Sequence, residues 1–305
     1  MSVLVVGSVA LDSVETPFGK ADEVLGGSGT FFSASACHLT PVQLVGVVGD
    51  DYPREKLQPL ADRGVDLAGL ETAAGASFRW RGRYRHDLNT AETLETHLGV
   101  FSHFKPKIPE AFRSAPFVFL ANIDPRLQLE VLDQVERPRL VACDTMNFWI
   151  ESRRPELLEL LSRVDLITLN DAEARQLTER ANLVQAARWI LERGPKHVVI
   201  KKGEHGAFMF THDTVFFAPA YPLESVFDPT GAGDSFAGGF MGYLASTGDL
   251  SEANMRRAVI YGSAMGSFAV EQFSIGGLMD LDLARIASRV DEFRRLVAFD
   301  AELPG

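Results

Sequence analysis

Residues 228–239 read Asp-Pro-Thr-Gly-Ala-Gly-Asp-Ser-Phe-Ala-Gly-Gly, and this stretch is the most informative of the chain. Positions 230–233 are small and flexible, and a helical pattern begins directly after them. A glycine-rich turn that opens a helix presents several backbone N–H groups, and the helix dipole reinforces their positive potential. Such a nest binds an anion. A simple helix cap would not explain the two acidic residues, Asp228 and Asp234, that bracket the turn.

A carboxylate beside such a nest has a specific chemical use. Negative charge builds on a phosphoryl group as it is transferred, and fixed amides stabilise that charge. The attacking hydroxyl must lose a proton, which a carboxylate can accept. Asp234 directly follows the turn, so we predict that it is the general base of a phosphoryl transfer. The P-loop pattern GxxxxGK[ST] is absent, and a dinucleotide fingerprint would follow the first strand rather than fall this late.

The composition is that of an ordinary globular protein, with 305 residues, 46% of them hydrophobic and 23% charged. Its net charge of −11 argues against nucleic acid as a partner, since phosphate backbones are bound by clustered Lys and Arg. The apolar runs are too short for a bilayer and no signal peptide is evident, so we expect a cytoplasmic protein without a membrane partner. The two cysteines and seven histidines show no disulfide or metal-ligand spacing.

Apolar runs alternate with helical patterns along the chain. Six short runs, rich in β-branched residues, predict buried strands: 3–6, 44–48, 118–120, 140–142, 166–169 and 198–200. This alternation predicts an α/β fold with a doubly wound, mostly parallel sheet flanked by helices, in a single domain over residues 1–305. Small or polar residues follow the strands, at the edge where ligands bind: Gly7, Asn122, Asp144, Asn170 and Lys201 to Gly203.

Two stretches, at about 13–25 and 76–100, interrupt this alternation. We predict that they form antiparallel strands that project from the body as a small β lid. One face of the second stretch carries Arg79, Arg81, Arg83 and Arg85, and the other carries Trp80 and Tyr84. An inward arginine face, with Arg79 on the substrate, would favour an anionic substrate. Inward aromatic side chains would favour a sugar or a nucleoside. An exposed lid edge could also pair two chains into a homodimer.

At this point the sequence resembles the ribokinase, or PfkB-type, carbohydrate kinases. Residues 228–239 are similar to that family's C-terminal signature, and Gly26-Gly27-Ser28-Gly29 resembles its N-terminal diglycine motif. Asn170-Asp-Ala-Glu173 matches an NxxE element, and residues 202–207 resemble a hairpin on the nucleotide side. Each motif is weak alone. In this order, across nearly the whole chain, the combination is specific.

The resemblance implies a ribokinase-like fold in which the β lid covers the substrate. It implies transfer of the γ-phosphate of ATP to a hydroxyl of a small sugar-type molecule. In this mechanism Asp234 is the base, and the amides of Gly231, Ala232 and Gly233 form the anion hole. The sequence thereby predicts a phosphotransferase with an alcohol group as acceptor.

The substrate would bind beside the first strand. By resemblance, Asp12 contacts its hydroxyls, for which a carboxylate is well suited, although a role as a turn residue is equally open. Gly26 and Gly27 would line the same site. Asp228, beside the anion hole, would contact the substrate or, with nearby carbonyls, hold a monovalent cation such as K⁺, which many members of the family use.

ATP and Mg²⁺ are the cofactors that the resemblance implies. Asn170 and Glu173 would hold Mg²⁺ through water near the phosphates. The remaining candidates for the nucleotide site are Lys202, Gly203, Gly206, Thr230, Ala258 and Gly262. Small residues at the last two positions would let a flat base approach, but helix packing explains them equally well.

The sequence departs from the family after the diglycine. Sugar kinases commonly carry Asn there, whereas this chain has Thr30, Phe31 and Phe32. Phe31 could stack on a nucleobase, although at least one of the two aromatic residues is expected in the core. Three hypotheses therefore stand: a sugar kinase, a nucleoside kinase of the same fold, and a nucleotide-binding protein without catalysis. The intact Asp234 argues against the third, and the missing fingerprint after the first strand argues against a dehydrogenase.

Overall fold

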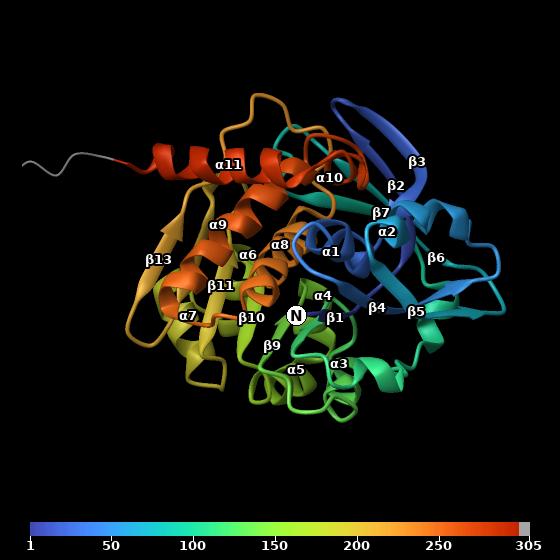
Figure 1. The fold of residues 1–305 in the computed structure, drawn as a ribbon, viewed down its shortest axis with the longest axis horizontal. Coiled ribbons are helices and arrows are strands. Elements are labelled where there is room, and N and C mark those ends of the chain that lie inside the picture. The colour runs from blue at the N-terminus through green and yellow to red at the C-terminus, as the bar shows by residue number, and fades with distance from the viewer. Residues whose placement is uncertain (299–305) are drawn as a thin grey trace, which may run out of the picture.

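A nine-stranded sheet runs through the centre of the computed structural model, which describes residues 1–298 (Figure 1). Its strands, in sheet order, are β13 (Val215–Ala218), β12 (Ala207–Phe210), β11 (His197–Lys201), β10 (Leu166–Asn170), β9 (Leu140–Asp144), β8 (Phe117–Leu120), β1 (Val3–Val6), β4 (Val42–Gly49) and β5 (Val65–Ala73). Neighbours from β5 to β11 are parallel, and β12 and β13 add an antiparallel edge. The predicted mostly parallel sheet is confirmed.

Helices cover both faces of the sheet. One face carries α1 (Ser28–Ala36), α2 (Gln58–Asp62), α8 (Ala232–Thr247), α9 (Glu252–Ala269), α10 (Gly276–Met279) and α11 (Leu283–Leu296). The other carries α3 (Pro125–Leu132), α4 (Asn147–Ser152), α5 (Arg154–Leu161), α6 (Asp171–Thr178) and α7 (Leu183–Leu191). Short 3₁₀ turns lie at η1 (Arg54–Leu57), η2 (Gly99–His103), η3 (Glu110–Phe112) and η4 (Gly203–His205). The doubly wound architecture is therefore as predicted.

The alternation of side chains along each strand decides which face a residue serves. In β1, Val3 and Val5 join the core on the α8 side of the sheet, whereas Leu4 and Val6 join the core on the α5 side. Both cores consist of apolar side chains, which explains why the strands read as continuous apolar runs. The acidic and basic side chains of the candidate site enter at the carboxyl ends of the strands, as Asp144 does in β9 and Lys201 in β11.

The lid is a separate four-stranded sheet, β3 (Gly19–Gly26), β2 (Ala10–Thr16), β6 (Phe78–Tyr84) and β7 (Ala91–His97), in that order. Its two hairpins, β2–β3 and β6–β7, are antiparallel as predicted, but β2 and β6 pair in parallel. The reason is that β2 continues from β1 and β6 from β5, and those strands are themselves parallel. β7 is an exposed edge strand, and the pairing of two lids stays a prediction.

Glycines let α8 pack closely against its neighbours. A Cβ at Gly239 would lie 2.6 Å from Cγ of Met265 on α9, and one at Gly242 would lie 3.2 Å from the backbone of Ala36 on α1. These close approaches hold the middle of α8 against α9 and α1. Across residues 1–298, none of the helices combines the length and the apolar character needed to cross a membrane.

Candidate active site

The glycine-rich turn opens α8 in a conformation that requires glycine. Gly231 is the N-cap residue and has a φ of +73°, which lies in the left-handed region. A Cβ at this position would overlap the ring of Phe31 on α1, so the turn rests directly on that aromatic ring. Asp234 follows in the first turn of the helix.

Phe31 and Phe32 both belong to the core in this structure. Phe31 is 2% exposed beneath Gly231, and Phe32 stacks on Phe119 with ring centroids 4.6 Å apart. The ring of Phe31 therefore has almost no free surface on which a substrate could stack. Its contact with a substrate stays a prediction.

The three amides of the predicted anion hole differ in whether they already donate a hydrogen bond within the protein. The Ala232 N–H donates to the Pro229 carbonyl at 3.2 Å. The amides of Gly231 and Gly233 donate to no backbone or side-chain acceptor within residues 1–298. Free N–H groups at the positive end of a long helix form the kind of anion site that the sequence predicts.

Asp234 lies among other charged side chains. Burial, together with the nearby carboxylate of Asp144, raises the pKa of its carboxyl group to about 7, whereas the ammonium group of Lys201 opposes the shift. A carboxylate with a pKa near 7 binds a proton more readily than an exposed one. This is the property that a general base at neutral pH requires.

Asp12 lies inside β2 rather than in a turn, and it is 5% exposed. Its carboxylate occupies the space that a side chain at Gly26 would fill. Burial, together with the charges of Asp228 and Asp234, raises its pKa to about 7. The diglycine and Asp12 therefore form one unit, close to the predicted base.

The aromatic face of the lid points towards the catalytic turn. The Thr230 hydroxyl donates to Oη of Tyr84 at 3.4 Å. The pKa of Tyr84 is raised to about 12 by burial, with Asp12 among the carboxylates that contribute. Trp80 stands opposite Asp12 in the β2–β6 register, so the two side chains share the inward face.

The arginine face of the lid points the other way, and its members are held in ion pairs. Arg79 contacts Glu23 at 2.8 Å and Asp51 at 2.7 Å. The other pairs are Arg81–Glu95, Arg83–Glu15 and Arg85–Glu92. The structure does not bring Arg79 together with Asp12 and Asp234.

The NxxE element forms a capping box at the start of α6. The Asn170 side chain accepts a hydrogen bond from the Glu173 amide at 2.8 Å, and Oε2 of Glu173 accepts one from the Asn170 amide at 2.7 Å. Burial, with the charge of Asp144, raises the pKa of Glu173 to about 7. Oε1 of Glu173 has no hydrogen-bond partner among residues 1–298. Free carboxylate oxygens suit the water shell of Mg²⁺.

Three adjacent strands supply a polar network that sequence reasoning identified only in part. The Lys201 ammonium group donates to Oδ2 of Asp144 at 2.8 Å, and the Thr168 hydroxyl donates to the same oxygen at 2.7 Å. Sequence analysis placed Lys201 at the ligand edge of the sheet, but it named Lys202 and not Lys201 for the nucleotide site. The missed signal is the period of two in β11, which places Lys201 on the same face as Val199 and α8.

The predicted nucleotide-side residues lie in two places. Gly203 and Gly206 both have positive φ, +52° and +88°, at the turn between β11 and β12. A Cβ at Gly203 would lie 2.5 Å from Oδ1 of Asn89, so the tip of the lid reaches this turn. Ala258 and Gly262 are buried where α9 packs on α8, which is the packing role that the sequence left open.

Asp228 is the most enclosed carboxylate of the site, at 1% exposed. Oδ1 accepts a hydrogen bond from the Thr230 amide at 2.9 Å, and Oδ2 accepts one from the Ser274 amide at 3.2 Å. Within residues 1–298 it forms no ion pair with a basic side chain. A buried carboxylate without a basic partner supplies the kind of oxygen ligand that a hard cation prefers.

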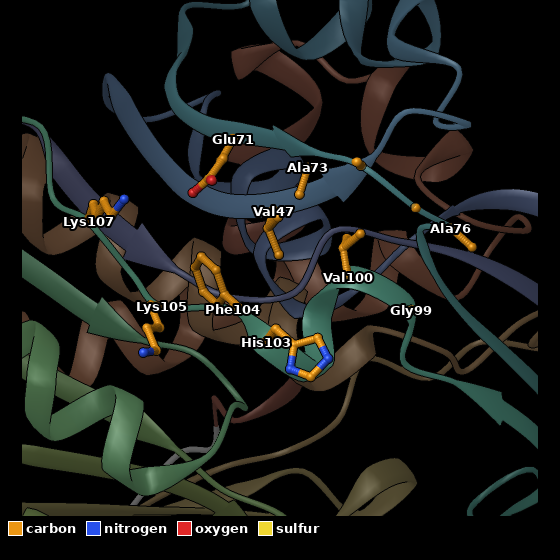
Figure 2. A pocket seen from close by; sticks show the side chains of 12 residues that line it. Val47, Glu71, Ala73, Ala76, Gly99, Val100, His103, Phe104, Lys105 and Lys107 are labelled. Atoms are coloured by element: carbon orange, nitrogen blue, oxygen red, sulfur yellow. The ribbon is translucent and has the colours of Figure 1, made fainter.

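A cavity of about 380 Å³ lies away from all these residues, against β4, β5 and η2 (Figure 2). Val47, Val100 and Phe104 form its apolar part, and Glu71 and Lys107 stand at its margin. None of the predicted catalytic or substrate residues lines it. The predicted site residues lie elsewhere, where the turn that opens α8 meets the lid at Thr230 and Tyr84.

The fold and the site together define a phosphotransferase that acts on a hydroxyl acceptor. Residues 3–280 match the model of the pfkB family carbohydrate kinases, and the chain belongs to this family. The family resemblance that the sequence motifs suggested is thus confirmed over nearly the whole chain.

Relatives and solved structures agree with this assignment. The chain is 32% identical to a cytidine kinase of Thermococcus kodakarensis over 79% of this chain and 87% of the relative. It is also 32% identical to a ribokinase of Haemophilus influenzae over 88% of this chain and 92% of that protein. The aminoimidazole riboside kinase of Salmonella enterica, solved with aminoimidazole riboside and an ATP analogue, superposes with a TM-score of 0.77 at 22% identity, covering 95% and 100% of the two chains.

Proposed function

We propose that the protein is an ATP-dependent nucleoside kinase that phosphorylates a primary hydroxyl of its acceptor. Asp234 supports this role most directly, because it stands beside free helix amides and has a pKa raised to about 7. The Asp234 carboxylate accepts the proton of the acceptor hydroxyl as the new oxygen–phosphorus bond forms. The bond between the β–γ bridging oxygen and the γ-phosphorus breaks, and ADP leaves with the electron pair.

Asp12 would orient the acceptor for this step. A carboxylate accepts hydrogen bonds from two neighbouring hydroxyls, such as those of a ribose ring. Its position on the diglycine, with Asp234 close by, would direct a third hydroxyl of the same sugar to the base. A fixed orientation of this kind makes a large contribution to the rate.

Mg²⁺ would be held through water by Asn170 and Glu173, and when bound it neutralises charge on the phosphates. Glu173 suits this role because its Oε2 is fixed by the capping box. Thr230, Gly203 and Gly206 remain the proposed contacts for the nucleotide. Asp228 would hold a monovalent cation such as K⁺. A higher rate in K⁺ than in Na⁺ for the wild type, with no such difference in Asp228→Asn, would support that role.

A nucleoside is favoured over an anionic sugar by the orientation of the lid. Tyr84 and Trp80 share the inward face, and aromatic rings there suit a nucleobase. The arginine side chains that would bind an anion are engaged with carboxylates on the opposite face. The identity to the cytidine kinase of Thermococcus kodakarensis supports the same choice.

A free pentose is the second candidate acceptor, favoured by the 32% identity to the ribokinase of Haemophilus influenzae. The test is ATP consumption with magnesium across cytidine, the other ribonucleosides, ribose and ribose phosphates. Turnover fastest with a nucleoside supports the proposal. Turnover with ribose alone would replace it with a sugar kinase, and ATP binding without turnover on any acceptor would contradict both.

A further inference from the structure

Lys201 is a lysine that the fold places beside the first turn of α8. It ends β11, its side chain is 16% exposed, and that of its partner Asp144 is 6% exposed. The ion pair joins the carboxyl ends of β11 and β9 across β10, where Thr168 binds the same carboxylate oxygen. The ammonium group is thus held by strands rather than by a loop.

The ammonium group lies beside the anion hole. A Cβ at Gly233 would stand 3.0 Å from Nζ of Lys201. Burial works against its charge, but the carboxylates of Asp144 and Glu173 hold the pKa of Lys201 above its ordinary value. A permanent positive charge is therefore held next to the free amides.

The hydrogen bonds of this group are incomplete. An ammonium group has three N–H donors, and within residues 1–298 Nζ donates only to Asp144. Asp144 is already engaged elsewhere, since its Oδ2 also accepts from Thr168 and its Oδ1 accepts from the Thr145 amide at 2.7 Å. A buried charge with free donors is costly unless an acceptor arrives. An oxygen-rich anion at the nest would satisfy those donors.

We propose that Lys201 is a catalytic residue that binds the γ-phosphoryl oxygens of the nucleotide during transfer. This inference rests on the proposed function and names a further group of the same site. Lys201 remains protonated throughout: the acceptor proton goes to Asp234, and the electron pair of the broken bond leaves with ADP. The ammonium group stabilises the charge on the phosphoryl oxygens as the phosphoryl group passes from ADP to the acceptor hydroxyl.

The alternative is that Lys201 only neutralises Asp144. Lys201→Met with Asp144→Asn separates the two roles, because the double variant removes both charges and leaves neither partner buried alone. Lys196→Met is the matched control. Lys196 directly precedes the first residue of β11 and pairs with Asp165 at 3.1 Å, and its side chain is far more exposed than that of Lys201.

The experiment measures binding of a non-hydrolysable ATP analogue and of ADP, both with magnesium, by calorimetry. We expect Lys201→Met and the double variant to bind the analogue at least about tenfold more weakly, with ADP affinity within about threefold of wild type, because only the analogue carries a γ-phosphate. Equal effects on both nucleotides, or none on the analogue, would overturn the assignment. If Lys201→Met does not fold, the double variant decides.

The catalytic rate gives a second readout. We expect kcat to fall about 10²–10³-fold in Lys201→Met, the usual loss for a donor to a developing oxyanion. The double variant should regain thermal stability but not kcat. Recovery of kcat would show that Lys201 is only a counter-ion. If the wild type phosphorylates no tested acceptor, the proposed function fails, while the two nucleotide affinities still decide whether Lys201 contacts the γ-phosphate.

Discussion

The ring of Phe31 lies against Gly231, in the space that any side chain at position 231 would fill. This contact ties the start of α1, just after the diglycine, to the turn that opens α8. The predicted substrate side and the predicted phosphate side of the site are therefore joined by one packing contact.

Gly231→Ala should reduce kcat by at least about 100-fold, because the new methyl group must displace either Phe31 or the amides of the nest. Gly64→Ala is the matched control. Gly64 also has a positive φ, +86°, but open space surrounds the position of its Cβ. The control should lose about 1 kcal/mol of unfolding free energy from backbone strain and keep its kcat. Equal kcat in the two variants would show that the Phe31 contact has no role in the site.

Asp12→Asn should raise the KM for the acceptor about 10–100-fold, because a hydrogen bond to a charged group contributes about 1.5–3 kcal/mol. The KM for ATP should stay within about twofold of wild type, since Asp12 lies on the acceptor side. Asp22→Asn, in the exposed part of the same hairpin, serves as the control. An acceptor KM that does not change would remove Asp12 from substrate binding.

The pH profile follows from the raised pKa of Asp234. The base must be ionised to accept a proton, so kcat/KM should fall about tenfold or more for each unit below pH 7 and level off above it. Asp12 and Glu173, whose pKa values are also raised to about 7, can only steepen the acidic limb. Initial rates measured between pH 5 and 9 test this. A value of kcat/KM that does not change between pH 9 and pH 5 would contradict it.

Arg79→Met should leave the KM for a neutral acceptor unchanged, because Arg79 is engaged with Glu23 and Asp51 on the outer face of the lid. Its loss should lower the unfolding free energy by about 1 kcal/mol or less, as for other partly exposed ion pairs. Chemical denaturation and steady-state kinetics measure both quantities. A large rise in acceptor KM would restore the arginine face as a substrate contact.

Much of the architecture could be predicted because it depends on local pattern. The apolar run at Val3–Val6 predicts a strand buried on both faces, and the acidic bracket around Thr230–Gly233 predicts the nest. The lid strands were also predicted, but the parallel pairing of β2 and β6 was not, since it depends on how two distant strands leave the main sheet. Asp12 was expected after the first strand, and only the fold shows that it lies inside the lid.

The missing parts of the site depend on contacts between distant segments. Lys201 and Lys202 are adjacent and chemically identical, and only the face of β11 on which Lys201 falls brings it to Asp144 and the anion hole. The alternation of side chains predicts that Tyr84 lies on one face of the lid. Its contact with Thr230 depends on how the lid sits on the main domain. Phe31 was a candidate to stack on a nucleobase, although at least one of Phe31 and Phe32 was expected in the core. The overlap of Phe31 with Gly231 depends on how α1 and α8 pack.

The most direct test of the account compares wild type with Asp234→Asn in phosphate transfer from ATP to cytidine, with ATP affinity measured in parallel. The account predicts a kcat about 10²–10⁴-fold lower in the variant, the usual range for loss of a general base, with folding and ATP affinity nearly unchanged. Wild-type turnover in Asp234→Asn would contradict the central claim.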